Sequence, residues 1–328
     1  MSCKKTSIGG QALIEGIMMR GPKKTAMAVR KKDGSIQIVP QTFKNLKDKC
    51  FLFKWPIIRG VVGFIDSMLV GYKAMMQSAE ISGYLDEEEK EKQQKAAKKG
   101  KEKKEKSSGA LIGGIMSLAT VLAVVLCALL FFWLPEKGFE GINYLLGFAN
   151  INLEAYRSIF AGVFKILIFF AYMIAVSFMK DIDRVFRYHG AEHKTIFCYE
   201  AGLPLTVENV KKQKRFHPRC GTSFLMLMLV VSICVTLLID IIFPGLTANN
   251  MIWLRILIKL PLIPIICGIG YELIKICGRY DNFLTRIIAA PGLWFQRITV
   301  KEPDDSMIEI AIAAMNEVIP ENEEDDKW

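Results

Sequence analysis

The stretch Ala110–Leu134, ALIGGIMSLATVLAVVLCALLFFWL, contains 25 residues and no charged side chain. As an α-helix it would be about 37 Å long, enough to cross the hydrocarbon core of a bilayer, which is about 30 Å thick. The whole chain of 328 residues shares this character, since 52% of its residues are hydrophobic and its mean hydropathy is +0.27. This composition excludes a disordered chain, a disulfide scaffold and an ordinary soluble enzyme, and it indicates a membrane protein.

Three further segments are apolar enough to be spans, namely Ser158–Met179, Thr222–Phe243 and Ile252–Tyr271. The last of them is interrupted by Pro261 and Pro264, which lack a backbone donor and kink a helix. We therefore expect a mainly α-helical, polytopic membrane protein with four spans. We also expect a small N-terminal cytosolic element that contains β-structure.

The positive charges predict an orientation for these spans. Of the 43 Lys and Arg residues, 38 lie in the segments 1–109, 180–221 and 272–328. Basic loops stay in the cytosol, so we expect both termini and the loop 180–221 to be cytosolic. The net charge of +10 is explained in this way, and we expect a lipid bilayer rather than nucleic acid as the partner.

Four ionisable residues fall in the outer halves of the expected spans: Lys165, Asp240, Arg255 and Lys259. Each costs about 3 kcal/mol in the membrane unless it is paired or reaches the interface. Two interpretations stay open. The side chains extend to the outer interface, or Asp240 pairs with Lys259 or Arg255 and marks a polar pathway.

The N-terminal segment predicts β-structure. Apolar residues alternate on both sides of Asp33-Gly34 within residues 25–39, which is typical of a β-hairpin. The glycine-rich stretch before the hairpin is apolar enough to be a packed strand or turn. It carries Glu15 and Arg20, a candidate ion pair.

Two features stand out after the spans. Residues 280–300 are amphipathic, and we expect them to lie along the inner leaflet. Ser306 and Glu309 have the spacing of a capping box, which predicts the start of a short soluble helix.

These observations divide the chain into five segments with different expected roles. They are an N-terminal cytosolic β-containing element (1–54), an interfacial or re-entrant helix (55–85), a charged linker (86–109), a four-span membrane domain with the cytosolic His/Cys loop 180–221 (110–271), and C-terminal interfacial and cytosolic helices (272–328).

The chain has three histidines, and all of them lie in the loop 180–221. His189 and His193 are four residues apart, so on a helix both imidazoles can reach one metal ion. Glu192 completes the pattern H-x-x-E-H, the residue set of a reversed zinc-protease motif in which the glutamate is the general base. His217 and Cys220 follow in the same loop as further candidate ligands.

Three interpretations of this cluster compete. In the first, zinc is held by His189, His193 and one of His217 or Cys220, with water in the open position and Glu192 as base. In the second, all four donors form a closed structural site. In the third, no metal binds. Against the first, Gly190 costs about 1 kcal/mol inside a helix, and a helix that began there would separate the two histidines.

A longer set of motifs carries a resemblance. The motifs are GGQA at 9–12, MMRGP at 18–22, HGAEHK at 189–194, HPRCGTSF at 217–224, APGLW at 290–294 and EPDD at 302–305. As a set, over about residues 6–320, the sequence resembles the YqhQ-like family of bacterial multi-pass membrane proteins, which carry a domain of unknown function and are often labelled metal-dependent enzymes. The resemblance implies a bacterial origin and a location in the inner membrane. The motif positions His189, Glu192, His193, His217 and Cys220 are all present.

Two functions are therefore expected from the sequence. The first is a zinc-dependent integral membrane hydrolase that acts at the cytosolic face, with Glu192 as its catalytic base. The alternative is a non-catalytic biogenesis or scaffold factor, with a structural metal, that binds other membrane proteins or the insertion machinery. A third candidate is a transporter, motivated by Asp240. Glu272 is a candidate remote ligand, since a distant glutamate completes the reversed motif in proteases.

Overall fold

The computed structural model describes residues 5–41, 51–55, 57–84, 118, 121–148, 153, 156–243, 257, 261–280 and 282–326. The chain forms two compact units. The first unit comprises Met1–Glu88, Met173–Met228 and Cys267–Trp328, and the second unit comprises Glu89–Tyr172 and Leu229–Ile266. The described residues are mainly helical, with one small N-terminal antiparallel sheet, as predicted.

The sheet has four strands in consecutive order, each antiparallel to the next. They are β1 (Gly9–Leu13), β2 (Gly16–Arg20), β3 (Thr25–Arg30) and β4 (Ile36–Gln41). The predicted hairpin is confirmed, because β3 pairs with β4 across a turn in which Gly34 has a φ of 84°. Pro40 cannot donate to a ladder, and it lies on the edge strand β4, where no donor is needed.

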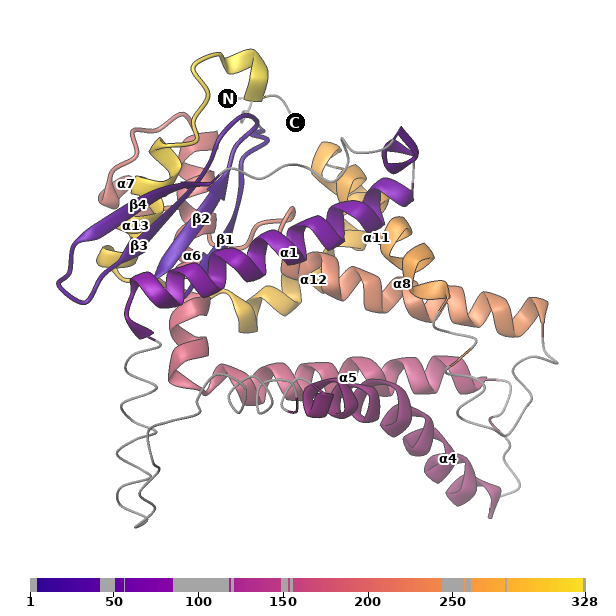
Figure 1. The fold of residues 1–328 in the computed structure, drawn as a ribbon. Helices are drawn as coiled ribbons and strands as arrows, with labels where there is room; N and C mark the ends of the chain where they lie inside the picture. The colour runs from indigo at the N-terminus through magenta and orange to yellow at the C-terminus, as the bar shows by residue number, and fades with distance from the viewer. Residues whose placement is uncertain are drawn as a thin grey trace, which may run out of the picture. The chain divides into compact units, whose positions relative to one another are not determined.

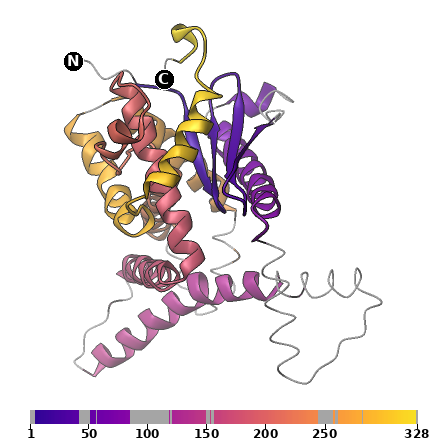
Figure 2. The same cartoon turned by 90° about the vertical axis from the view of Figure 1, so that its left-hand side faces the viewer.

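The sheet is the middle layer of the first unit (Figures 1 and 2). Side chains alternate between its faces, so Ile17 and Met19 pack with helices α6 (Lys180–Glu200) and α13 (Asp305–Asn316), while Met18 packs with helix α1 (Ile58–Ile81). Burying one such side chain contributes about 1.5–3 kcal/mol. The sheet therefore ties together three distant parts of the sequence.

Several shorter elements and two further helices accompany the layers around the sheet. They are the 3-10 helices η2 (Phe51–Lys54) and η5 (Glu323–Asp326), and the helices α7 (Val207–Lys211), α11 (Leu262–Arg279) and α12 (Phe283–Thr299). Helix α12 begins with a capping box between Asn282 and Thr285.

The predicted capping box at Ser306 and Glu309 is wrong. Asp304 caps helix α13 instead, since its Oδ1 accepts the Met307 N–H at 3.0 Å, and the Glu309 carboxylate pairs with Arg30 at 3.1 Å. Aspartate is as good a cap as serine, and this one lies two residues earlier.

The predicted ion pair between Glu15 and Arg20 is also wrong. Glu15 lies in the β1–β2 turn with a φ of 52°, and both of its carboxylate oxygens accept from Arg184 of α6 at 2.5 Å. Arg20 instead lies 3.6 Å from Asp66 of α1. The turn directs Glu15 toward α6, whereas Arg20 points toward α1 on the other side of the sheet.

The two ends of the described chain meet beside α6. The carboxylate of Asp326 accepts from the Thr6 hydroxyl at 2.5 Å and from the Ser7 N–H at 3.1 Å. Its other oxygen accepts from the Tyr199 hydroxyl at 2.9 Å. Asp326 is fully buried, so these bonds replace its hydration.

Three helices among the described residues are long and apolar enough to cross a membrane: Val121–Gly147, α5 (Arg157–Ser177) and α8 (Gly221–Ile242). They are compatible with membrane association. The last two agree with the predicted spans, but the first continues as α4 (Leu134–Gly147) through a segment that we expected to be a loop. A π-helical turn, η3 (Leu129–Trp133), precedes Pro135 and accommodates its missing donor, so the helix does not end there.

The prediction of four spans is wrong for the described residues, which contain three. Most of 252–260, including Arg255 and Lys259, lies outside them, as does the charged linker 86–109. Helix α11 begins at Leu262 and carries Glu272, Lys275 and Arg279, too many charges for a span of 18 residues.

Polar side chains gather inside the second unit. Ser158 donates to the carboxylate of the half-buried Asp240, so this aspartate has a partner on a neighbouring helix. Glu136, Ser158 and Lys165 line a cavity of about 20 Å³, which is room for one water molecule. The polar side chains of these apolar helices thus turn toward one another.

Candidate metal centre

Helix α6 carries the H-x-x-E-H pattern without a break from Lys180 to Glu200. Gly190 does not end it, contrary to the concern raised by its low helix propensity. A Cβ at this position would lie 1.9 Å from the carbonyl oxygen of Lys301, and the Lys301 N–H donates to the Phe186 carbonyl at 2.9 Å. Glycine is required here because another stretch of backbone crosses the helix.

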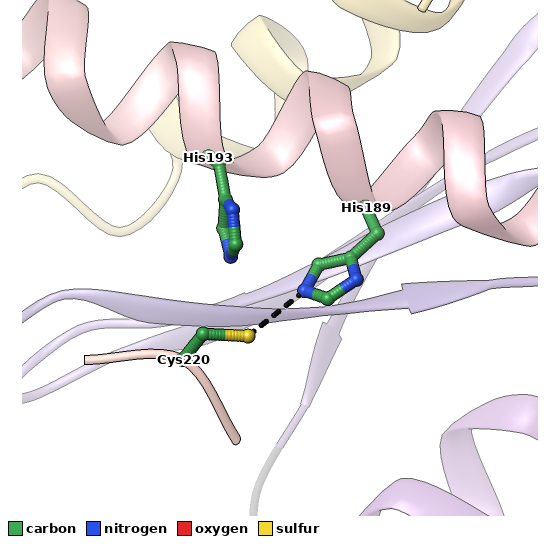
Figure 3. Close-up of side chains that lie close together, drawn as sticks. All are labelled: His189, His193 and Cys220. Atoms are coloured by element: carbon green, nitrogen blue, oxygen red, sulfur yellow. Dashed lines mark hydrogen bonds between the residues drawn. The ribbon is translucent and has the colours of Figure 1, made fainter. Parts of the chain in front are cut away.

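Three side chains converge at one point of the first unit, as Figure 3 shows. His189 and His193 project from α6, and Cys220 approaches from the residue before α8. The Cys220 Sγ lies 3.1 Å from the His189 Nε2, and the two imidazole centroids are 4.4 Å apart. One ligand atom from each residue lies within 4.8 Å of the others, so the three could hold a metal ion.

Backbone carbonyls orient both imidazoles. The His189 Nδ1 lies 2.9 Å from the Thr299 carbonyl oxygen, and the His193 Nδ1 lies 2.6 Å from that of Arg215. A carbonyl can only accept, which assigns the proton to Nδ1 and leaves Nε2 directed inward as a donor to a metal. The buried His193 Nε2 has no hydrogen-bond partner among the described residues, as expected of a ligand atom.

Glu192 lies beside the three donors but does not join them. Its carboxylate accepts from the Gly10 N–H of strand β1, and its buried Oε2 has no hydrogen-bond partner among the described residues. A Cβ on Gly10 would lie 2.8 Å from the Glu192 carboxyl carbon, so the strand can approach this closely only with a glycine. One carboxylate oxygen of Glu192 is therefore held by strand β1, and the other is available to accept a hydrogen bond or a proton.

Without a metal, the ionisable groups of this cluster shift one another's pKa values. Burial would raise the pKa of the Cys220 thiol, but the neighbouring His189 and His193 imidazoles lower it well below its usual value. Burial would lower the pKa of His189, but the Cys220 thiolate, Glu192 and the Thr299 carbonyl raise it to about 9. Burial raises the pKa of Glu192. A thiolate is the form in which cysteine binds metals.

His217 is not part of this group. Its Nε2 lies 3.7 Å from a Glu200 carboxylate oxygen and 3.3 Å from an Arg219 nitrogen, and its ring packs at a tilt against that of Phe197, with the centroids 4.6 Å apart. Burial lowers its pKa. The candidate remote ligand Glu272 is not part of the group either. Its two carboxylate oxygens accept from the Arg59 Nε at 2.7 Å and from the Arg59 Nη2 at 2.5 Å.

No sequence pattern indicates the residues that position this centre. Thr299 and Arg215 act through their carbonyls, for which any side chain would do. Gln296 is fully buried and binds both the N–H and the carbonyl of His217. The motif HPRCGTSF was the only available sign that this loop is constrained.

The donor set fits zinc. Imidazole nitrogens and thiolates are both ligands of zinc, and catalytic zinc sites have three protein ligands with a fourth position open for water or substrate. The unpartnered His193 Nε2 and the hydrogen bond that the Nδ1 of each histidine makes to a backbone carbonyl are the features that such a set requires.

Two comparisons with known proteins agree with the resemblance drawn from the motifs. Residues 55–321 match the model of a family described as protein of unknown function (DUF1385). The chain is 34% identical over 312 residues to a protein of Bacillus subtilis (strain 168) described as uncharacterized protein YqhQ, covering 95% of this chain and 92% of the relative. No solved structure matches the chain. With a family match over most of its length and this close a relative, the chain belongs to the DUF1385 family, which includes residues of both α6 and the Cys220 loop in its matched region.

Proposed function

We propose that this chain is a zinc-dependent hydrolase that acts at the cytosolic face of the bacterial cell membrane. One observation carries the proposal: the buried Glu192 Oε2 has no partner among the described residues, beside three side chains that can share a metal ion. A buried carboxylate is costly to leave unpaired. A water molecule in the open position of a zinc site would be its partner.

The residues have separate roles in this proposal. Zinc, when bound, would polarise a water molecule and a substrate carbonyl. His189, His193 and Cys220 would hold the ion. Glu192 takes the proton of the attacking water on Oε2 and passes it to the leaving group, a role that suits a carboxyl whose pKa is raised by burial.

The experiment uses the full chain in nanodiscs. We expect about one zinc per chain by elemental analysis, and with cobalt in its place we expect the charge-transfer absorption of a thiolate ligand. p-Nitrophenyl acetate serves as the hydrolysis probe, because a nucleophilic water cleaves it without specific recognition. Glu192→Gln should keep the metal and lose at least about 100-fold in turnover.

Glu208→Gln is the matched control, since Glu208 is an exposed glutamate on α7. This variant should retain both metal and turnover. Equal turnover in Glu192→Gln and wild type would contradict the hydrolase, and a chain that binds no zinc would contradict the metal centre.

A second candidate is a non-catalytic factor in which the metal is structural. The burial of the site favours it, since none of His189, Glu192, His193 and Cys220 is more than 9% exposed. Its partners would be other membrane proteins or the insertion machinery. Under this alternative, chelation lowers the melting temperature of the chain, while Glu192→Gln changes neither complex formation nor any hydrolysis.

A further inference from the structure

Helix α12 has two faces with different surroundings. One face is buried and includes Gly292, Phe295, Gln296 and Thr299. The opposite face presents large apolar side chains: Phe283 is 80% exposed, Leu284 63%, Ile287 52% and Trp294 67%. Exposing so much apolar surface to water costs free energy, so we expect another molecule to cover this face.

The buried face of α12 contacts residues that form or flank the candidate metal centre. Gln296 Oε1 accepts the His217 N–H at 2.8 Å, and its Nε2 donates to the His217 carbonyl at 2.6 Å. One turn later, the Thr299 carbonyl orients the His189 imidazole at 2.9 Å. Both parts of the centre, the helix that carries the histidines and the loop that carries Cys220, therefore depend on the position of α12.

The start of helix α8 fixes where α12 lies. Gln296 Nε2 also donates to the Ser223 hydroxyl at 2.7 Å, and a Cβ on Gly292 would lie 2.6 Å from the Ser223 Cβ. Ser223 lies in the first turn of α8, which is long and apolar enough to cross a membrane. If α8 enters the bilayer, α12 lies at the level of entry.

The charges on α12 complement an anionic surface. Within Phe283–Thr299 the only charged residues are Arg286 and Arg297, and there is no acidic residue. The Arg297 guanidinium lies 5.9 Å from the centre of the Trp294 ring. Tryptophan and arginine beside an apolar stripe are typical of helices that lie in the interface of an anionic bilayer.

We propose that the apolar face of α12 lies in the interface of an anionic bilayer and that this contact keeps Gln296 and Thr299 in place against the metal centre. Lipid contact thus raises the affinity of the centre for metal. The coupling rests on the proposed metal binding, whereas the lipid contact does not. The partner is the phospholipid surface, with its acyl boundary against the apolar side chains and its phosphates against the arginines.

The first experiment tests the lipid contact alone. The full chain has five tryptophans, so we compare wild type with Trp294→Phe in nanodiscs of phosphatidylglycerol that contain a brominated phospholipid. Bromine quenches indoles at the acyl boundary. The Trp294 contribution, taken as the difference, should be strongly quenched, and an unquenched Trp294 would overturn the proposal.

The second experiment tests the coupling by zinc titration in the same nanodiscs. Phe283→Glu/Ile287→Glu changes only exposed side chains, so it should weaken zinc binding by about tenfold or more, as the loss of an orienting partner does. Ile38→Glu is the matched control, because Ile38 is 40% exposed on strand β4, and it should bind zinc as wild type does.

The outcomes separate the two proposals. Unchanged zinc affinity in the α12 variant, together with lost quenching of its Trp294, overturns the coupling. If the Trp294 fluorescence of wild type is quenched but the chain binds no zinc, the metal centre is overturned and with it the coupling. Equal affinity in phosphatidylglycerol and in detergent also overturns the coupling.

Discussion

Gly190 shows how one missing side chain allows a site to form. The residue lies between His189 and Glu192, and the backbone of Lys301 crosses it within contact distance. The same crossing segment carries the Thr299 carbonyl that orients His189. Close backbone packing at Gly190 is therefore part of the geometry of the metal centre.

Gly190→Ala should displace this segment, because a Cβ cannot lie 1.9 Å from a carbonyl oxygen. We expect a loss of about 1–3 kcal/mol in the free energy of unfolding, together with weaker zinc binding. Thermal unfolding and zinc titration measure the two effects. Gly141→Ala is the control, since nothing lies within 4 Å of its added Cβ, and unchanged zinc binding in Gly190→Ala would contradict the role of the crossing.

Glu200 is the residue for which a pH dependence follows. Burial would raise its pKa, but the hydrogen bond with His217, the charge of Arg219 and the Thr6 N–H together lower it. A carboxyl whose pKa is lower when folded contributes stability above its unfolded value, and this contribution is lost as the pH falls through the folded value.

Glu200→Gln should therefore destabilise the chain by about 3 kcal/mol at neutral pH, because the Arg219 guanidinium loses the buried carboxylate with which it pairs. The difference from wild type should shrink below the ordinary glutamate pKa. Urea unfolding of both chains across this range measures it. A difference that grows toward acid pH would show that the carboxylate is not the stabilising form.

At the scale of single residues, local spacing predicts part of the site. The separation of His189 and His193 by four residues places both on one face of α6, as the structure has them. The choice between His217 and Cys220 was left open, because it depends on the loop conformation that Gln296 fixes from a remote helix. Hydrogen bonds over that distance leave no pattern in the loop itself.

At the scale of elements, strand β1 and helix α6 meet where Gly10 contacts Glu192. The strand is an edge of the sheet, yet α6 covers it. The Gly10 N–H holds one carboxylate oxygen and so directs the other. The strand thus positions the proposed base.

Gly10→Ala should push the Glu192 side chain away while the three metal ligands stay in place. We expect normal zinc content and a reduced rate with p-nitrophenyl acetate, by about tenfold or more. Gly9→Ala is a neighbouring control, because nothing lies within 4 Å of its added Cβ. If the two variants have the same rate, β1 does not position Glu192.

Hydrophobic runs in the sequence predicted the bounds of some helices better than those of others. Two apolar segments, around α5 and α8, contain a single charged residue each, and their predicted bounds were nearly correct. The first apolar helix extends beyond the expected end at Leu134, because the π-helical turn before Pro135 lets the helix continue. The sheet pattern was easier, since alternation and Asp33-Gly34 are local properties of the chain.

At the scale of the whole molecule, packing constrains the number of membrane crossings. The sheet, α6 and α13 pack together in the first unit, so all three lie on the same side of any membrane. Along the sequence, two candidate spans, Val121–Gly147 and α5, separate the sheet from α6, and two crossings would return the chain to the same side. Between α6 and α13 only α8 is a described candidate span, so a crossing by α8 requires a return before α13.

If α8 crosses the membrane, we expect Phe243, the residue after α8, on the opposite side from the sheet and α13. Cysteines at Phe243, Ser35 and Glu309, introduced singly, can be labelled with an impermeant maleimide in intact cells and in inverted vesicles. Phe243→Cys should react from outside, and Ser35→Cys and Glu309→Cys only in inverted vesicles. The parent chain without added cysteine sets the background, and labelling of all three from one side would exclude a crossing by α8.

The bonds that Asp326 makes to Thr6, Ser7 and Tyr199 also bear on biosynthesis. The sheet is translated first, but the helix that covers its face, α13, emerges from the ribosome last. Until then the nascent polypeptide carries a half-covered apolar sheet, which must be shielded by a chaperone or stay unformed. Chains stalled before residue 305 should be cleaved readily by protease within the first strands, whereas released chains resist.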